Sequence, residues 1–376
     1  MNRRLHIIAL NVPYPPDYGG VIDIYYKLQA LHSLGVGIVL HCFAGERQRA
    51  EELEELCEKV YYYERRTGWA TNLSALPYNV AGRKGDGLAH NLLADNSPIL
   101  FEGLHSCYHL ADPRIATRLK IFRAGNIEHD YYRHLARSCR EPLAKAFHYL
   151  EALRFKHYER VINSADIILG ISLSDTEYFG RRFPSKRTVF MPAFHAGERI
   201  TSVAGRSDFV LYHAKLSVPE NERAALFLLR EVFPRLAAPC IVAGMNPSQR
   251  ILRAAARYPH ISVVANPSEE EINTLVSEAQ VNMLATFQAT GLKLKLLKSL
   301  FSGRHVVADN LMLAGSGLDA LCRIANGADE MVAACHELLG APFTEEEISR
   351  RRSVLIPAYT SSFQAARLLA LLSDSD

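Results

Sequence analysis

The fold is decided by residues 5–43, which read LHIIALNVPYPPDYGGVIDIYYKLQALHSLGVGIVLHCF. A β-rich apolar run over 5–12 is followed by a turn over 13–20 that contains proline and glycine. Apolar residues at helical spacing then cover 21–34, and a second apolar run covers 36–43. A strand, a helix and a second strand in this order predict a parallel sheet with a right-handed crossover.

The same alternation continues along the chain in two series. The first series adds expected strands at 60–63, 98–101, 119–123, 166–171 and 187–191, with a long helical stretch over 130–163. The second adds expected strands at 209–213, 240–243, 261–265, 281–285 and 305–308, with a helix over 291–302. Between them lies a segment rich in glycine and serine, which is typical of a linker.

Two βα series joined by one linker predict an α/β protein of two Rossmann-like domains. We expect an N-terminal domain over 1–195 and a C-terminal domain over 206–355. The last segment, 356–376, is expected to form an amphipathic helix that packs back on the N-terminal domain.

Charge and cysteine content exclude several classes of protein. The 43 Lys and Arg residues offset 40 Asp and Glu, and a net charge of +3 is too small for a nucleic-acid binder. It suits local positive patches for an anionic ligand, or a light contact with an anionic membrane. The seven cysteines have no metal-type spacing, which favours reduced thiols. With no apolar run of about 18 to 20 residues and no signal-peptide pattern, we expect a cytoplasmic protein.

Gly19 and Gly20 form the first candidate binding element. They stand where the first helix is expected to begin, and glycine there lets a ligand approach the free backbone N–H groups, which favour anions. The alternative is a tight strand-to-helix turn that binds nothing.

Three lysines form the second candidate element. Residues 290–303 read TGLKLKLLKSLFSG, which places Lys293, Lys295 and Lys298 in the first two turns of an expected helix. Positive side chains at a helix N-terminus oppose the macrodipole, so the arrangement favours a bound anion. The alternative is that the lysines extend from an amphipathic helix into solvent.

These motifs together resemble the retaining GT-B glycosyltransferases of group 1 (family 4-like). The opening strand with Pro-x-Pro-x-x-x-Gly-Gly is similar to that family's N-terminal glycine loop. Residues 209–216 followed by 219–221 resemble the first strand and turn of its C-terminal domain, and 291–308 resemble its donor-binding motif. The resemblance implies the GT-B fold, in which two Rossmann-like domains face each other across a cleft.

The resemblance also implies roles for individual residues. Backbone N–H groups of Thr290, Gly291 and Leu292 would hold the diphosphate of a nucleoside diphosphate sugar. Lys215 and Lys295 would offset phosphate charge as the leaving group departs, beside Lys293 and Lys298. Gly19 and Gly20 would line the opposite wall of the cleft. Such chemistry uses no cofactor and no metal, because basic side chains neutralise the diphosphate.

Two positions depart from the family pattern. The family usually has a pair of glutamates where this chain has Thr290 and Lys298, and the second of them binds the ribose. A lysine cannot accept hydrogen bonds from ribose hydroxyls. Relatives also often place a histidine where this chain has Gly125. Glu128 or His129, close by, would serve instead, or the chain has lost turnover.

Further polar residues lie at expected strand ends. Glu102 and His105 follow the fourth strand, where ligands of α/β proteins bind, or they belong to a plain surface loop. His195 lies at the domain junction. We take Glu128, His129 and His105 as the candidate catalytic residues.

Two classes of function remain. The first is a retaining glycosyltransferase that moves a sugar to a glycan or lipid-linked acceptor in bacterial cell-surface polysaccharide synthesis, with a peripheral contact to the inner face of the membrane. The second is a catalytically degenerate GT-B module that binds a partner or scaffolds a complex. A GT-B epimerase would need a pair of acid and base carboxylates, which the sequence does not show.

Overall fold

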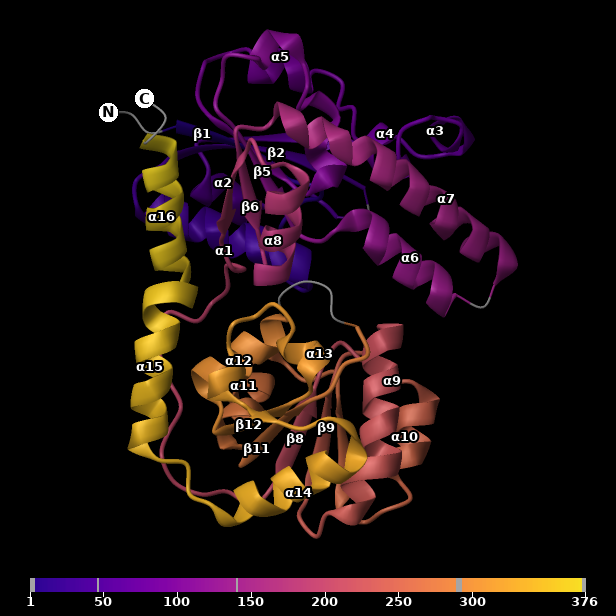
Figure 1. Cartoon of the computed structure of the whole chain (residues 1–376), viewed down its shortest axis with the longest axis vertical. Coiled ribbons are helices and arrows are strands. Elements are labelled where there is room, and N and C mark those ends of the chain that lie inside the picture. The colour runs from indigo at the N-terminus through magenta and orange to yellow at the C-terminus, as the bar shows by residue number, and fades with distance from the viewer. Residues whose placement is uncertain (1–3, 46, 140, 289–292, 374–376) are drawn as a thin grey trace. The chain divides into compact units, whose positions relative to one another are not determined.

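The structure is a computed structural model that describes residues 4–45, 47–139, 141–288 and 293–373. It divides into two compact units. The first unit comprises residues up to 196 together with the C-terminal segment from 361, and the second comprises 197–288 and 293–360. Figure 1 shows the elements of both units.

The first unit is built around a seven-stranded parallel sheet in the order β3-β2-β1-β4-β5-β6-β7. Its strands are β1 (Arg4–Ile8), β2 (Gly37–Ala44), β3 (Lys59–Glu64), β4 (Ile99–Glu102), β5 (Lys120–Ala124), β6 (Ile167–Gly170) and β7 (Arg187–Phe190). Its α-helices are α1 (Gly19–Ser33), α2 (Glu51–Leu56), α3 (Trp69–Asn72), α4 (Tyr78–Ala81), α5 (Leu88–Leu92), α6 (Glu128–Ser138), α7 (Pro142–Tyr158), α8 (Leu173–Arg182) and α16 (Ser361–Ser373). Short 3-10 helices cover Leu104–His109, Pro113–Ile115 and Glu159–Ser164.

The second unit has a six-stranded parallel sheet in the order β10-β9-β8-β11-β12-β13. Its strands are β8 (Val210–His213), β9 (Cys240–Gly244), β10 (Ile261–Ala265), β11 (Val281–Leu284), β12 (His305–Ala308) and β13 (Arg323–Ile324). Its helices are α9 (Pro219–Phe227), a π-helical turn (Leu228–Val232), α10 (Gln249–Ala255), α11 (Glu269–Glu278), α12 (Leu294–Ser302), α13 (Asn310–Leu313), α14 (Gly327–Gly340) and α15 (Glu345–Tyr359), with 3-10 turns at Phe233–Arg235 and Asp319–Leu321. Two parallel sheets with helical connections confirm the predicted α/β class.

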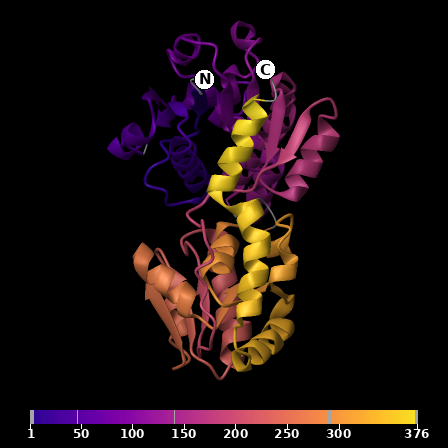
Figure 2. The ribbon, with the colours of Figure 1, turned by 90° about the vertical axis from the view of Figure 1, so that its left-hand side faces the viewer.

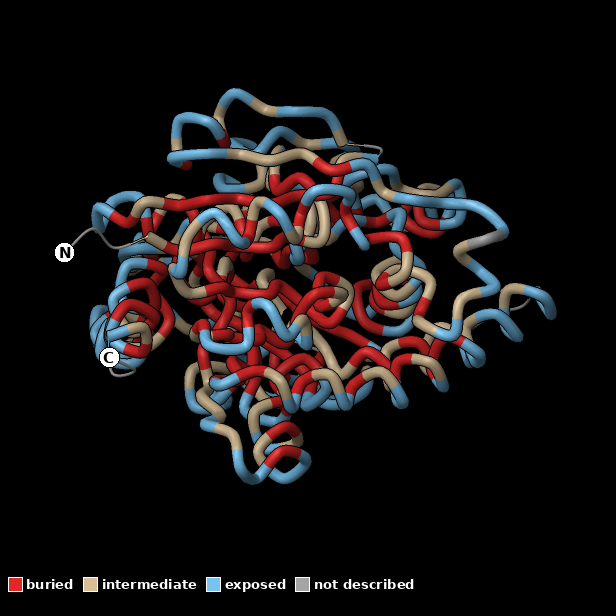
Figure 3. The backbone as a smooth tube through the Cα atoms, turned by 90° about the horizontal axis from the view of Figure 1, so that it is seen from above, coloured by how far each residue is buried: buried red, intermediate tan, exposed pale blue. Residues whose placement is uncertain are grey.

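Both faces of the first sheet are buried. Leu5 and Ile7 of β1 belong to one apolar cluster, whereas Ile8 belongs to a second cluster. Side chains of a strand alternate between the two faces, so these clusters are the cores that lie above and below the sheet. Figure 3 colours the backbone by burial and shows the buried residues concentrated in the interior.

The C-terminal helix completes the first of these cores. Leu368, Leu369 and Leu371 of α16 join the cluster that contains Ile24 and Leu28 of α1. Thr360 alone separates α16 from α15, although the two helices belong to different units (Figure 2). The prediction that the terminal helix packs back on the N-terminal domain is therefore confirmed.

Two helix starts are fixed by side chains that the sequence displays. Ser172 accepts a hydrogen bond from the backbone N–H of Asp175 and caps α8. Ser268 and Glu271 form a reciprocal capping box at the start of α11. Both bonds satisfy N–H groups that the first turn of a helix leaves free.

Two predictions about helices need correction. The single helical stretch over 130–163 is two helices, because α6 ends at Ser138 and α7 begins at Pro142, where proline is favoured in a first turn. The helix expected from 291 begins at Leu294 with Lys293 as its N-cap. Residues 309–355, for which no element was predicted, contain α13, β13, α14 and α15.

Candidate active site

The strand order of each sheet reverses at one point. The reversal lies between β1 and β4 in the first unit and between β8 and β11 in the second. On either side of such a point the connections run in opposite directions, which leaves room at the carboxyl ends of the two strands. The side chains at these two positions are therefore the candidates for a ligand site.

In the second unit, three segments meet at the carboxyl ends of β8, β11 and β12. The Thr286 backbone N–H donates to Asp309 Oδ2 over 2.8 Å, and the Thr286 hydroxyl donates to Glu220 Oε1. Asp309 also accepts from the Met312 N–H over 2.7 Å and so caps α13. These bonds fix the loop after β11 against the start of α9.

Lys295 lies in the first turns of α12 beside this network. Its Nζ is 3.5 Å from Asn221 Oδ1 and lies 5.2 Å from the centre of the Tyr212 ring. Burial lowers the pKa of Lys295 to about 8, opposed by the negative charges of Glu220 and Asp309. The neighbouring charge of Lys293 lowers the pKa further. Lys295 is therefore a poorly solvated cation that a nearby anion would stabilise.

The other basic residues of the predicted donor site lie around Lys295. Lys215 follows β8, is exposed, and accepts a hydrogen bond on its backbone oxygen from Asn221 over 3.1 Å. Lys298, one turn beyond Lys295, has a pKa lowered by burial and opposed by the charge of Glu269. Thr290, Gly291 and Leu292 lie outside the described residues.

His213 is a buried residue close to Lys295 and Lys298. Burial lowers the pKa of His213 to about 3, and the charges of Lys298 and Lys295 lower it further. The ring is therefore neutral at pH 7 and lies 3.2 Å from the Ser299 hydroxyl. It contributes packing and one hydrogen bond rather than charge.

In the first unit, Gly19 and Gly20 form the exposed first turn of α1, after the N-cap residue Tyr18. A Cβ atom on Gly20 would approach Cε2 of the Tyr18 ring to 3.3 Å. The Tyr18 hydroxyl accepts a hydrogen bond from Asn11 over 2.8 Å. The glycines therefore keep the entry to α1 open beside a fixed tyrosine ring.

His105 and Glu128 are brought together at the ends of β4 and β5. His105 Nδ1 lies 3.6 Å from Glu128 Oε1. Burial raises the pKa of Glu128 to about 8, and the charge of Asp175 adds to the effect. Burial also lowers the pKa of His105 to about 3, with Arg83 and Arg65 contributing. At pH 7 the pair thus consists of a neutral histidine and a mostly protonated carboxyl.

The remaining predicted residues have structural partners. His129 Nδ1 lies 3.3 Å from Glu159 Oε2 and the ring packs on Tyr178, so it is not part of the His105–Glu128 pair. His195 is buried, and its backbone N–H and oxygen both bond to the Ser361 hydroxyl at the start of α16.

Glu102 belongs to a buried ion cluster. Its Oε1 lies 2.5 Å from Lys27 Nζ, which also lies 3.2 Å from Asp23. Arg123 donates two hydrogen bonds of 2.9 Å to Asp23. Asp23 also accepts from the Phe194 N–H, so the cluster holds the end of β7 and the following segment to the sheet.

Sequence reasoning did not single out five residues of these two groups. They are Glu220, Thr286 and Asp309 in the second unit, and Arg65 and Arg83 in the first. The two arginines lie in or beside the segment 67–95, which has no clear periodicity. The signal available for Glu220 was its place directly after Pro219 at a helix start, where acidic residues are common.

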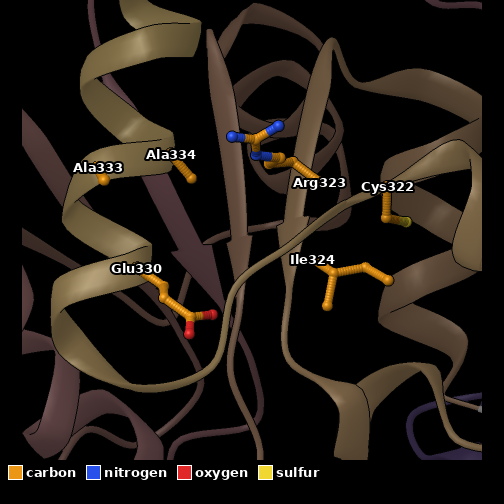
Figure 4. A pocket seen from close by; sticks show the side chains of 6 residues that line it. All are labelled: Cys322, Arg323, Ile324, Glu330, Ala333 and Ala334. Carbon is orange, nitrogen blue, oxygen red and sulfur yellow. The ribbon is translucent and has the colours of Figure 1, made fainter.

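A hollow of about 470 Å³ lies at the edge of the second sheet. Figure 4 shows its lining, which comes from the region of β13 and from α14: Cys322, Arg323, Ile324, Glu330, Ala333 and Ala334. Arg323 is paired with Glu337 at 2.7 Å, and Glu330 accepts from the Asn326 N–H. The charged groups of the hollow are therefore already paired, unlike Lys295.

Two features are absent from the residues that the structure describes. In the described part of the chain, no three His, Cys, Asp or Glu residues are grouped so that they would hold a metal ion. Among the described helices none has the length and apolar character needed to cross a membrane.

Comparisons with known proteins agree with this architecture. Residues 207–341 match the family model of group 1 glycosyl transferases. An uncharacterized 44.6 kDa protein in the cps region of Klebsiella pneumoniae is 25% identical over 354 residues, covering 89% of each chain.

Solved structures show the same fold over the whole chain. The α,α-trehalose-phosphate synthase (UDP-forming) of Burkholderia xenovorans, in complex with glucose-6-phosphate, superimposes with a TM-score of 0.66 at 12% identity, covering 99% of this chain and 100% of that one. Anabaena Alr3699/HepE, in complex with UDP and glucose, gives a TM-score of 0.65 at 10% identity, with the same coverage.

The class of the protein follows from these findings. The fold is that of the GT-B glycosyltransferases, and the second unit carries the group 1 domain that contains Lys215, Glu220, Thr286 and Lys295. Residues 207–341 are therefore a group 1 glycosyl transferase domain in a chain with the GT-B fold, which confirms the predicted resemblance and the predicted enzyme class.

Proposed function

We propose that the chain moves a sugar, with retention of configuration, from a nucleoside diphosphate sugar to a glycan or lipid-linked acceptor in cell-surface polysaccharide synthesis. The cps-region relative supports the biological setting. The structural neighbour in complex with UDP and glucose supports a nucleotide-sugar donor. The observation that carries the proposal is the partly desolvated Lys295 at the strand reversal of the second unit.

Lys295 suits a diphosphate better than it suits its present neighbours. Glu220 and Asp309 act on it through their charge, while Lys295 donates a long hydrogen bond of 3.5 Å to the neutral Asn221 amide. Glu220 and Asp309 are themselves engaged by Thr286. A diphosphate beside Lys295 would supply the close anionic partner that the lysine lacks, with Lys215 and Lys293 adding positive charge.

In this proposal the bond between the anomeric carbon and the phosphate oxygen breaks, and its electron pair goes to the departing diphosphate. Lys295 stabilises the charge that develops there. The acceptor hydroxyl bonds to the same face of the anomeric carbon and passes its proton to the leaving phosphate oxygen. No protein base is needed, which agrees with Glu128 being mostly protonated at pH 7.

The donor is identified by combining binding with turnover. The purified chain is screened with UDP, GDP and ADP sugars by thermal shift, because a ligand of the folded state raises the melting temperature. Release of the nucleoside diphosphate, with and without an acceptor extract, measures turnover. We expect one donor both to stabilise the protein and to be consumed, at a rate that EDTA leaves unchanged.

Two other outcomes decide against the proposal. Stabilisation without consumption of any donor favours the degenerate module, which binds a nucleotide sugar but does not transfer it. A flat thermal response across all three bases favours a binding or scaffolding role with no nucleotide-sugar ligand.

The acceptor proposal includes a peripheral contact at the inner face of the membrane. Helix α7 exposes Leu143 (81%), Leu150 and Leu153. Nearby in the fold, α3 exposes Trp69 (77%) and Leu73, and Asn72 of α3 accepts a hydrogen bond from Arg154 of α7 over 2.8 Å. Such an apolar patch on a monomer marks an interaction surface.

The charges around the patch favour an anionic lipid surface. Exposed basic residues on and beside α6 and α7 are Arg137, Lys145, Lys156 and Arg160, and an exposed acidic one is Glu141. Basic residues beside apolar ones bind the headgroup region through both charge and burial.

Vesicle sedimentation tests this contact. The wild-type chain is expected to bind phosphatidylglycerol vesicles, to bind phosphatidylcholine vesicles weakly, and to lose binding in the double variant Leu143→Glu, Leu153→Glu. The variant Val203→Glu changes an apolar residue of the second unit that is 62% exposed, close to the 64% of Leu153, and is expected to bind like wild type. Equal binding to both vesicle types, or by the double variant, contradicts the contact.

A further inference from the structure

The strand reversal of the first unit contains a buried cation with only neutral partners. Arg83 is 3% exposed. Its Nε donates to the Leu10 backbone oxygen over 2.6 Å, and its two terminal nitrogens donate to the Asn79 oxygen (2.8 Å) and to Asn11 Oδ1 (3.3 Å). Among the described residues no carboxylate pairs with it.

A second arginine adds to the uncompensated charge. Arg65 follows β3, is half-buried, and donates to Asn79 Oδ1 over 2.6 Å, the same oxygen that lies 3.4 Å from Arg83. The Nε of Arg65 is buried and has no hydrogen-bond partner. Desolvation lowers the pKa of Arg83 to about 10, and the charge of Arg65 lowers it further.

Other buried arginines in the chain show how such a charge is normally compensated. Arg123 makes two bonds with the carboxylate of Asp23. Arg351 donates to the backbone oxygens of Leu300, Gly303 and Arg304, at the negative end of α12. Arg83 has neither a carboxylate nor the end of a long helix, and the charge that acts on it most strongly, that of Arg65, has the same sign.

The surroundings add no negative charge. The nearby His105 is neutral, and Glu128 beside it is mostly protonated at pH 7. Hydroxyl groups complete the group, because Tyr132 accepts from Asn79 over 2.7 Å and Tyr18 accepts from Asn11. These are hydrogen-bonding groups suited to a sugar or an oxyanion, and they lie at the carboxyl ends of the strands, where ligands of α/β proteins bind.

We propose that Arg65 and Arg83 form an oxyanion subsite that binds a phosphate or carboxylate group of the acceptor. Arg65 contacts the anion through its half-buried guanidinium group, while Arg83, held by Leu10 after β1 and by Asn79 of α4, supplies the buried charge behind it. Guanidinium groups match the geometry of both oxyanions and remain charged when buried. The identity of the ligand as the acceptor rests on the proposed function, whereas the anion site itself does not.

Three kinds of ligand carry an oxyanion that would fit this subsite, and the test distinguishes them. Binding of inorganic pyrophosphate, glycerol phosphate and glucuronate is measured by calorimetry on the full chain, standing for a lipid diphosphate, a phosphate monoester and an acidic sugar. To remove binding at the donor site, every protein in the series carries Lys295→Ala.

The decisive comparison is between neighbouring arginines. Arg65→Gln is expected to lower the affinity for the tightest-binding of the three anions by at least about tenfold, as for loss of a charge-assisted hydrogen bond. Arg65→Lys is expected to recover part of that loss. Arg66→Gln is the matched control, since Arg66 is exposed and paired with Asp86 at 2.7 Å, and it is expected to bind like the parent. Melting curves establish that each variant is folded.

The outcomes distinguish this inference from the proposed function. No binding of any of the three anions, or equal weakening by Arg65→Gln and Arg66→Gln, overturns the subsite whether or not the wild-type chain transfers sugar. If anion binding depends on Arg65 but the chain consumes no donor, the subsite is supported. In that case only the transferase proposal is contradicted.

Discussion

The two strand reversals of this molecule carry opposite electrostatic designs. At the reversal of the second unit, the negative charges of Glu220 and Asp309 act on Lys295, although neither carboxylate forms an ion pair with it. At the reversal of the first unit, Arg83 and Arg65 share an amide oxygen, and the nearby carboxyl of Glu128 is mostly protonated. Carboxylates therefore offset part of the charge of Lys295, whereas among the described residues none pairs with Arg65 or Arg83.

The difference shows what each position is suited to do. Fixed carboxylates hold a cation in position, and a ligand must compete with them for it. This arrangement suits a leaving group whose negative charge grows during the reaction. A cation with neutral partners retains its full attraction for an anion, which suits binding of a group that does not react. We interpret the second unit as the donor side and the first as the acceptor side.

The largest expected effect tests the donor side. Lys295→Ala is expected to lower the rate of transfer by about 10²- to 10³-fold, comparable to loss of one donor to a developing oxyanion. Steady-state release of the nucleoside diphosphate measures it. Lys186→Ala, a lysine of the first unit away from both reversals, serves as the control, and a Lys295→Ala enzyme as fast as this control would falsify the role of Lys295.

Donor affinity is expected to depend on pH through Lys295. The charged form binds the diphosphate, so affinity is full below about pH 7 and falls as pH rises through the pKa of about 8. Above that value the loss approaches about tenfold per pH unit. Calorimetric titrations at pH 6.5, 8 and 9.5 measure it. Lys295→Arg remains charged throughout, and a slope as steep in that variant contradicts the assignment.

The stability of the first unit is expected to depend on pH through Glu128. Its folded pKa of about 8 lies above the value of about 4.3 for an unfolded chain, so the native state holds the extra proton between these values. The free energy of unfolding therefore falls as pH rises from about 4.3 to 8, and by linkage the fall ends above pH 8.

Glu128→Gln removes that dependence while keeping the shape of the side chain. The free energy of unfolding of the variant is expected to match that of the wild type near pH 5. At pH 9 it is expected to be higher by roughly 1–3 kcal/mol, the cost of burying an unsatisfied polar group. Urea unfolding at the two pH values gives the difference. A constant gap between the proteins would show that Glu128 is ionised at neutral pH.

The smallest expected effect concerns the carboxylates around Lys295. Glu220→Gln removes a charge that raises the pKa of Lys295, so the midpoint of donor affinity is expected to move to lower pH. The same calorimetric series measures the shift. A midpoint that stays in place, or moves to higher pH, would mean that Glu220 does not act on this lysine.

Much of the fold was predictable because local patterns determine it. Apolar runs bounded by turns marked most strands. β13 was not found, because a strand of two residues has no period. The break in 130–163 was missed although Pro142 marked it, because apolar and polar residues continue at helical spacing on both sides.

The candidate site was predictable only in part. Lys293, Lys295 and Lys298 were visible because they share one helix, and Gly19 and Gly20 because they share one turn. Glu220, Thr286 and Asp309 were not, because they come from three segments that meet only when β8, β11 and β12 align in the sheet. Glu102 drew attention as a strand-end carboxylate, but the fold pairs it with Lys27.

The sequence by itself determined the two parallel sheets, the helix that returns to the first unit, and the basic start of α12. Each follows from the spacing of apolar, small and charged residues along a short stretch of chain. The tertiary structure alone decided which charges are compensated. Whether Arg83 meets a carboxylate, and whether Glu128 keeps its proton, depends on burial and on partners distant in the chain, which no local pattern contains.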